Sequence, residues 1–214
     1  MRYLVGIDEV GRGSLAGPVV VAAALVPREL KITNRELGIL KDSKKLTARQ
    51  REKWFCYITA HPHINYAVAR VYPRGIERMN ITKAANLAAF RAFTRLSKSC
   101  VLSPKSLRIY LDGGLYLKSS GWQRANSNPD VKSGPRPERR GRQIAKTVVR
   151  GDEKISAIKI ASILAKVSRD RFMTRLAKRH PRYGFEIHKG YGTRAHFKAI
   201  KKYGPSEAHR LTFL

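Results

Sequence analysis

The sequence predicts an α/β fold, and three patterns support this prediction. Five short apolar runs rich in β-branched residues have the length of buried strands. Longer segments with apolar residues at helical spacing alternate with them. Three of the five runs lead into acidic residues that have a glycine close by. Strands alternating with helices are typical of α/β domains.

The five predicted strands are separated by turn-forming residues. A cluster of glycines together with Pro18 forms the turn between the first two runs. The third run ends just before Pro73, and the fourth leads into Asp112. The predicted strands cover residues 3–7, 19–26, 64–71, 107–111 and 144–149.

The predicted helices have recognisable start and stop signals. Thr47 and Gln50 have the spacing of a capping box and open the first helix. Asn80 is the expected cap of the second, and Pro181 ends the third. After the first helix, the predicted helices cover residues 81–96, about 156–178 and 195–202.

Charge indicates the class of partner. The chain has 44 Lys or Arg against 15 Asp or Glu, a formal net charge of +29. Such an excess indicates a polyanionic partner, most simply nucleic acid. The 43% hydrophobic content excludes wholesale disorder. The length of 214 residues predicts a single domain over residues 1–214.

Several other classes are disfavoured. The longest uncharged stretch, residues 14–27, is shorter than the roughly 20 apolar residues that cross a bilayer. Charged residues at Arg2, Asp8 and Glu9 interrupt the position of a signal peptide's apolar region. Cys56 and Cys100 form no metal or redox motif, which indicates a reducing, cytoplasmic location. The histidines lack zinc-ligand spacing.

Residues 118–143 differ in composition from the rest of the chain. They are rich in Pro, Gly, Ser, Asn and basic residues and contain almost no aliphatic ones. This composition predicts a basic, flexible insertion outside the core.

The positions of the few acidic residues indicate a catalytic function. Asp8 and Glu9 follow the first predicted strand, Asp112 follows the fourth, and Asp152 follows the fifth. Ligands of open α/β sheets gather at strand ends, so separate segments could bring these groups together. Clustered carboxylates repel one another unless a cation such as Mg²⁺ neutralises them. Two such ions can hydrolyse a phosphodiester, which favours a nuclease or a polymerase.

Each acid also has a simpler interpretation, because Asp at a strand end commonly forms a turn or caps a helix. The same holds for the other candidates. The glycines of Gly11-Arg12-Gly13 allow close approach to a sugar or phosphate but are also ordinary turn residues. Lys44 could clamp a phosphate, and Tyr191 could stack on a nucleotide.

The ordered set of motifs closely resembles bacterial ribonuclease HII, a type 2 ribonuclease H. These motifs extend from residue 3 to residue 213. They are Asp8-Glu9-Val10-Gly11-Arg12-Gly13, Leu15-Ala16-Gly17-Pro18, Asp42-Ser43-Lys44-Lys45-Leu46, Gly151-Asp152, Ala161-Ser162-Ile163-Leu164-Ala165-Lys166-Val167 with Arg169-Asp170-Arg171, His188-Lys189-Gly190-Tyr191-Gly192-Thr193, Gly204-Pro205 and His209-Arg210.

The resemblance implies a ribonuclease H-like fold with a central mixed five-stranded sheet flanked by helices. It also implies a monomeric endoribonuclease that uses Mg²⁺ or Mn²⁺. Such an enzyme cuts RNA in RNA–DNA hybrids and nicks on the 5′ side of single ribonucleotides in duplex DNA. The expected products are a 5′-phosphate and a 3′-hydroxyl, and the expected role is removal of ribonucleotides from DNA.

The resemblance also assigns roles to residues. Asp8, Glu9, Asp112 and Asp152 would be the catalytic metal ligands. Gly11, Arg12 and Gly13 would recognise the ribose 2′-hydroxyl, Lys44 would contact a phosphate, and Tyr191 would pack on the DNA side of the RNA-to-DNA junction.

Three features of the sequence allow another interpretation. Asp152 follows Asp112 by forty positions, more than the resemblance leads us to expect, which leaves the register of Asp112 open. Asp170 is a competitor, for which we expect a structural ion pair with a neighbouring Arg. The alternatives are a non-catalytic, ribosomal-type RNA-binding protein and another nuclease of this fold, such as a junction resolvase.

Overall fold

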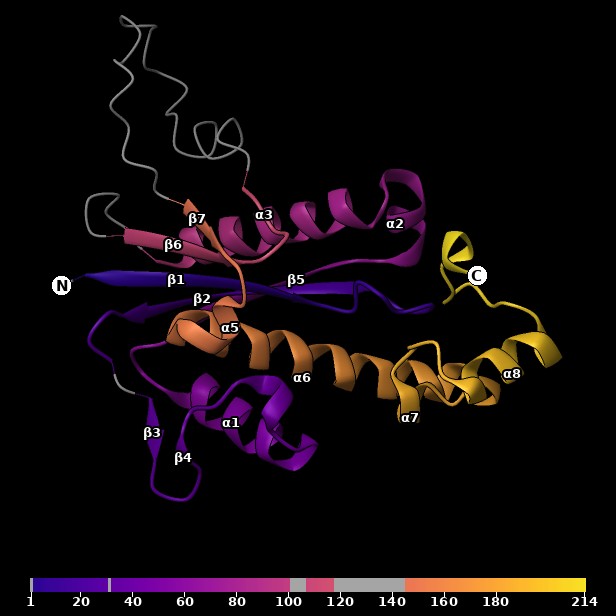
Figure 1. Cartoon of the computed structure of the whole chain (residues 1–214), viewed down its shortest axis with the longest axis horizontal. Coiled ribbons are helices and arrows are strands. Elements are labelled where there is room, and N and C mark those ends of the chain that lie inside the picture. The colour runs from indigo at the N-terminus through magenta and orange to yellow at the C-terminus, as the bar shows by residue number, and fades with distance from the viewer. Residues whose placement is uncertain (1, 31, 101–106, 118–144) are drawn as a thin grey trace, which may run out of the picture.

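A mixed five-stranded sheet forms the centre of the protein, as predicted (Figure 1). The computed structural model describes residues 2–30, 32–100, 107–117 and 145–214. Within these residues the strand order is β5-β2-β1-β6-β7. The strands are β1 (Tyr3–Val10), β2 (Val19–Pro27), β5 (Asn65–Val71), β6 (Leu107–Asp112) and β7 (Ala145–Val148).

The strand directions bring four strand ends to one side. β1 runs parallel to β6, and β6 runs parallel to β7. β2 is antiparallel to both β1 and β5, so β5 points the same way as β1. The carboxyl ends of β1, β5, β6 and β7 therefore meet at one edge, called here the carboxyl edge. In register, Ile7 lies beside Leu111, and Asp112 lies beside Val148.

Helices cover both faces of the sheet (Figure 1). α2 and α3 lie on one face, and α1, α5 and α6 lie on the other. β2 is buried on both faces: Val19 and Val21 join the α3 core, whereas Ala22 and Ala24 join the α6 core. The helices are α1 (Ala48–Ala60), α2 (Pro73–Met79), α3 (Ile81–Ser99), α5 (Gly151–Lys154), α6 (Ser156–Arg179), α7 (Phe185–His188) and α8 (Arg194–Tyr203).

The predicted helix starts are confirmed at two positions. The Thr47 hydroxyl accepts from the Gln50 N–H, and the Gln50 side chain accepts from the Thr47 N–H. Asn80 caps α3 through its side chain, which accepts from the Lys83 N–H. These bonds satisfy backbone donors that have no partner inside the helix.

The predicted positions of the acids relative to the strand ends were wrong in detail. β1 continues to Val10, so Asp8 and Glu9 lie inside the strand, because pairing with β2 extends to Val20. Asp112 is the last residue of β6. Asp152 lies in the short helix α5, which begins after a left-handed turn at Arg150.

Other differences concern short elements. The hairpin of β3 (Thr33–Asn34) and β4 (Gly38–Ile39), α2 and α7 were not predicted, because such short elements leave little periodicity. The proposed insertion at 118–143 and the predicted start of the fifth strand at residue 144 lie outside the described residues. Within the described part of the chain, no helix is both long and apolar enough to span a bilayer.

α6 lies directly on β1. A Cβ atom on Gly6 would lie 2.1 Å from the carbonyl carbon of Ala157 in α6. This contact is to backbone, which cannot rotate away as a side chain could. The absence of a side chain at Gly6 therefore sets the distance between the strand that carries Asp8 and the longest described helix.

We predict that Gly6→Ala lowers the free energy of unfolding by about 3 kcal/mol or more, because α6 must move off β1. Urea unfolding monitored by circular dichroism measures the change. Gly13→Ala is the control, since no described atom lies within 4 Å of a Cβ placed there. Equal stability of Gly6→Ala and the wild type would contradict the packing argument.

Candidate active site

Three of the predicted metal ligands converge at the carboxyl edge. Asp8 and Asp112 lie on the adjacent parallel strands β1 and β6, and Glu9 follows Asp8. Burial and the negative charges of Glu9 and Asp112 raise the pKa of Asp8 well above its ordinary value. Burial, together with the charge of Asp112, also raises the pKa of Glu9, although Arg12 partly offsets this effect. The three carboxylates therefore repel one another.

Asp152 joins this group through a lysine. Lys44 Nζ donates to Asp152 Oδ2 at 2.9 Å, and the Asp152 side chain is only 2% exposed. The carboxylates of Asp152, Asp42 and Asp8 all raise the pKa of Lys44. The Gly151 N–H donates to Asp112 Oδ1 at 2.8 Å, which joins α5 to the end of β6. Lys44, predicted to contact a phosphate, therefore lies among the acids in this structure.

A serine pair connects the Lys44 loop to Asp8. The Ser162 hydroxyl in α6 forms a hydrogen bond with Asp8 that lowers the pKa of this carboxyl, opposing the effect of burial. Ser43 Oγ lies 2.7 Å from Ser162 Oγ, and both serines are buried. Sequence reasoning did not assign either residue. A polar residue within the apolar run of α6 was the available signal.

Arg12 forms an ion pair with Glu9. Arg12 Nη1 lies 3.2 Å from Glu9 Oε1, and Arg12 Nη2 donates to Thr82 Oγ1 at the start of α3. Glu9 Oε2 is buried and has no hydrogen-bond partner among the described residues. Arg12 therefore pairs with one oxygen of the Glu9 carboxylate, and the other oxygen, Oε2, can still bind a ligand.

The oxygen donors suit a hard divalent cation. A cation would relieve the repulsion among Asp8, Glu9 and Asp112 and give Glu9 Oε2 a partner. As they stand, however, no three Asp, Glu, His or Cys side chains of the described residues are grouped to hold an ion. Arg12 and Lys44 instead neutralise Glu9 and Asp152, and Lys44 would have to move for Asp152 to become a ligand.

Two buried arginines hold the loop between β1 and β2 by its carbonyl oxygens. Arg169 and Arg210 are both 0% exposed, and burial together with the charge of Arg169 lowers the pKa of Arg210 to about 9. A Cβ on Gly11, which has φ +86°, would lie 2.2 Å from Arg169 Nε. The accepting carbonyls belong to Gly11, Arg12, Ala16, Gly17 and Pro18. The loop shape therefore depends on groups that the sequence did not assign to it.

Tyr191 is placed against this loop. It pairs with Ser14 through a β-bridge, and the Arg169 guanidinium lies 5.3 Å from the centre of its ring. Lys166 Nζ lies 5.7 Å from the same ring centre. The structure thus brings the glycine loop and Tyr191 together through Arg169.

The predicted partner of Asp170 was wrong. Asp170 Oδ1 forms an ion pair with Lys166 Nζ at 3.0 Å, one helical turn earlier, rather than with a neighbouring arginine. Its neighbour Arg169 points to loop carbonyls, and Arg171 binds Glu52. The structural role expected for Asp170 holds with a different cation.

Two neutral imidazoles, those of His209 and His196, connect Ser206 to the backbone of Tyr191 through three hydrogen bonds. The Ser206 N–H donates to His209 Nδ1 at 2.9 Å, so the His209 proton is on Nε2. That proton is donated to His196 Nε2 at 3.1 Å, and His196 Nδ1 therefore donates to the Tyr191 carbonyl at 2.9 Å. Burial lowers the pKa of His209 to about 4. The segment that carries Arg210 is joined to Tyr191 in this way.

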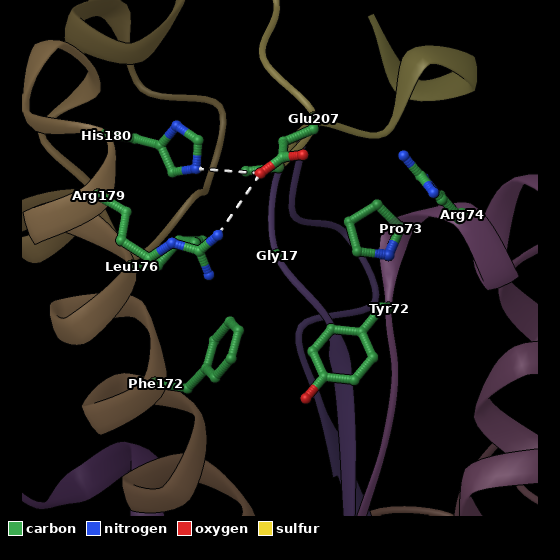
Figure 2. A pocket seen from close by; sticks show the side chains of 10 residues that line it. Gly17, Tyr72, Pro73, Arg74, Phe172, Leu176, Arg179, His180 and Glu207 are labelled. Atoms are coloured by element: carbon green, nitrogen blue, oxygen red, sulfur yellow. Dashed lines mark ion pairs between the residues drawn. The ribbon is translucent and has the colours of Figure 1, made fainter.

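A separate hollow of about 400 Å³ lies farther along the carboxyl edge, beyond Gly17 (Figure 2). Tyr72 and Phe172 face each other across it, with ring centres 5.8 Å apart. Glu207 at its rim lies 3.8 Å from Arg179 and 3.9 Å from His180. None of the four predicted metal ligands is among its described lining residues.

Comparison with known proteins decides the family. Residues 5–214 match the family model described as Ribonuclease HII. The chain belongs to the ribonuclease HII family. The ribonuclease HII of Caldicellulosiruptor saccharolyticus is 41% identical over 213 residues, which is 100% of this chain and 87% of that protein. The protein is therefore a hydrolase that cuts RNA in RNA–DNA hybrids, which excludes the non-catalytic RNA-binding alternative.

Solved structures share the ribonuclease H-like fold. The ribonuclease H2 of Pyrococcus horikoshii OT3 aligns with a TM-score of 0.66 and 25% identity, over 98% of this chain and 93% of that chain. A crystal structure of Bst-RNase HIII in complex with Mn²⁺ aligns with a TM-score of 0.68 and 23% identity, over 99% of this chain and 67% of that chain.

We predict that acidification weakens the His209 contacts. Unfolded His209 takes up a proton near pH 6.5, but the folded form does so only near pH 4. The contribution of neutral His209 to the free energy of unfolding is therefore fully present above pH 6.5. It is lost as the pH falls towards 4, by an amount on the order of 2 kcal/mol. Urea unfolding of the wild type and His209→Gln at several pH values measures the difference.

The difference in stability between the two proteins should shrink as the pH falls from 7 to 4.5. The exposed His63→Gln variant controls for loss of an imidazole outside this contact chain. A constant difference between the wild type and His209→Gln across this range would count against a neutral His209.

Proposed function

We propose that this ribonuclease HII family member nicks duplex DNA on the 5′ side of an embedded ribonucleotide as well as cutting RNA–DNA hybrids. In this proposal it uses Mg²⁺ or Mn²⁺ and leaves a 5′-phosphate and a 3′-hydroxyl. The observation that carries the proposal is the mutual repulsion of Asp8, Glu9 and Asp112 inside a protein of net charge +29.

Asp8, Glu9, Asp112 and Asp152 would hold the metal. When bound, divalent cations activate water for attack on a phosphodiester and stabilise charge on the leaving oxygen. The donor chemistry supports this assignment, because carboxylate oxygens are the ligands that Mg²⁺ and Mn²⁺ prefer. The relative in complex with Mn²⁺, which shares the fold, is consistent with it.

Other residues of the chain would orient the reactants. Arg12 holds Glu9 Oε1 and leaves Oε2 free for a ligand. Lys44 would leave Asp152 when the metal arrives and then face the phosphate, which its exposed side chain allows. In this arrangement Lys44 neutralises the acids before metal binding and the substrate afterwards.

The loop after β1 would select ribonucleotides. Gly11 is buried against Arg169 and its carbonyl accepts from Arg210 at 2.7 Å, so the backbone of this loop is held in place. Gly13 is exposed, with open space where a side chain would begin. We propose that Gly11, Arg12 and Gly13 contact the ribose 2′-hydroxyl, the group that distinguishes RNA from DNA. Tyr191 would pack on the adjacent deoxynucleotide.

We predict that the protein nicks a duplex with one embedded ribonucleotide in Mg²⁺ and leaves the matching all-DNA duplex intact. Labelled strands resolved on a denaturing gel measure both reactions, and EDTA should stop the first. Equal cutting of the two duplexes would reject selection by the 2′-hydroxyl. It would also favour the alternative of a nuclease with another specificity.

We predict that Asp8→Asn lowers cleavage at least about a thousandfold, because several kcal/mol of charge stabilisation are lost with the metal. Stability should be unchanged or higher, since the pKa of Asp8 is raised and its charge is repelled. Mg²⁺ should raise the melting temperature of the wild type but not of the variant.

Glu29→Gln is the matched control for loss of one negative charge. Glu29 is exposed and follows β2 at the edge opposite the carboxyl edge. This variant should keep both the activity and the response to Mg²⁺. An active Asp8→Asn would show that Asp8 is not an essential ligand.

A further inference from the structure

A groove between the start of α1 and the middle of α6 carries excess positive charge. Its volume is about 450 Å³. The acids that line it are Glu52 and Asp170. The basic residues that line it are Arg49, Arg51, Arg171, Arg175 and Lys189. We call it the α1–α6 groove. None of the four carboxylates described above is among its described lining residues.

Both acids of the groove are already neutralised. Glu52 Oε2 binds Arg171 Nη2 at 2.5 Å, and Arg171 also lies 4.4 Å from the centre of the Phe55 ring. Asp170 is paired with Lys166. Because both acids are paired, they attract a cationic partner only weakly and repel an anion only weakly.

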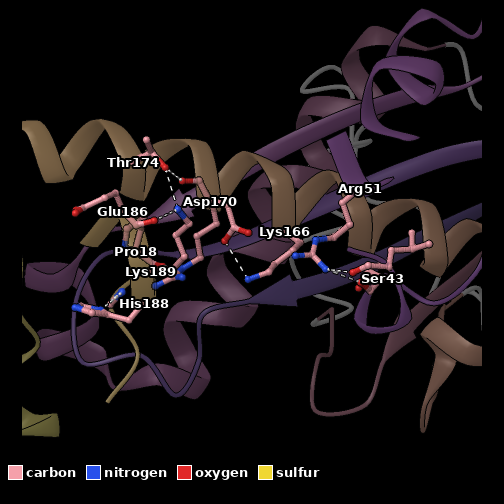
Figure 3. A network of polar contacts seen from close by, with 12 residues as sticks. Pro18, Ser43, Arg51, Lys166, Asp170, Thr174, Glu186, His188 and Lys189 are labelled. Atoms are coloured by element: carbon pink, nitrogen blue, oxygen red, sulfur yellow. Dashed lines mark hydrogen bonds and ion pairs between the residues drawn. The ribbon is translucent and has the colours of Figure 1, made fainter. Parts of the chain in front are cut away.

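Two of the remaining cations form the ends of the groove. Arg51 Nη1 donates to the carbonyls of Ser43 and Leu46, on either side of the loop that carries Lys44. Lys189 Nζ donates to Thr174 Oγ1 at 3.0 Å, and Figure 3 shows these contacts along α6. Both residues are held in place by neutral groups, and neither forms an ion pair with a described acid.

Arg49 and Arg175 are free. Both are exposed, and neither forms an ion pair with any described residue. An exposed guanidinium can bind two oxygens of one phosphate. The groove thus has fixed cations in its walls and two adaptable ones at its surface.

The groove continues two elements of the proposed substrate site. One end is the Lys44 loop, through Arg51. The other is the loop with Tyr191, because Lys189 precedes Tyr191 by two residues and Lys166 lies beside its ring. A duplex held at Lys44 and Tyr191 would therefore have its backbone next to Arg49 and Arg175.

We propose that the α1–α6 groove binds the sugar–phosphate backbone of the substrate duplex away from the cleaved bond, through Arg49 and Arg175. The proposal rests on the proposed function for the identity of the duplex. The lining favours a phosphate backbone over an acidic peptide, because Ala48 and Val167 are its only aliphatic residues among those described. Contacts of this kind add affinity without reading sequence.

The test compares Arg49→Ala/Arg175→Ala with the wild type. Fluorescence anisotropy in EDTA gives the Kd for the duplex with one ribonucleotide at several salt concentrations. If each arginine neutralises one phosphate, the slope of log Kd against log salt should fall by about 1.8. In Mg²⁺, KM should rise while kcat stays unchanged.

Two further variants make the result specific. Arg28→Ala/Arg108→Ala removes two exposed charges at the opposite edge of the sheet and should leave the slope unchanged. Arg49→Lys/Arg175→Lys keeps the charges and should restore most of the slope. A wild-type slope in Arg49→Ala/Arg175→Ala would overturn the groove proposal. Failure of the wild type to nick the duplex would instead reject the proposed function.

Discussion

The contact of α6 with β1 at Gly6 determines where the groups of the site lie. Backbone meets backbone there, so the helix is held against the strand that carries Asp8 and Glu9. Along α6, Ser162 then reaches Asp8, Arg169 reaches the loop after β1, and Arg175 reaches the α1–α6 groove. A displacement of this helix would shift all three, since rigid packing transmits movement.

Positive charge serves three different purposes in the protein. Arg169 and Arg210 are fully buried and use their donors on backbone carbonyls, where they shape the glycine loop. Lys44 and Arg12 lie among the acids and neutralise them. The remaining excess is on the surface, where it can attract a polyanion. The net charge of +29 therefore combines structural, local and substrate-directed contributions.

Local patterns predicted the parts of the fold that depend on local forces. The capping residues Thr47 and Asn80 and the continuous apolar run of β2 follow from hydrogen bonding and burial within a few residues. The ends of β1 and β6 were less predictable, because pairing with a neighbouring strand decides where a strand stops. The partner of Asp170 was mispredicted for a related reason, since Arg169 and Arg171 have partners far away in the sequence.

The sequence by itself determined the α/β class, the charge that requires a polyanion, and the acids and glycines available for chemistry, because these follow from composition and short-range order. Only the tertiary structure decided that Lys44 pairs with Asp152 and that Ser162 bonds to Asp8. It also decided that Arg169 packs against Gly11 and that Arg210 donates to the Gly11 carbonyl. Such contacts join residues as many as 199 positions apart. They depend on the direction of each strand and the placement of α6, which no local pattern of side chains specifies.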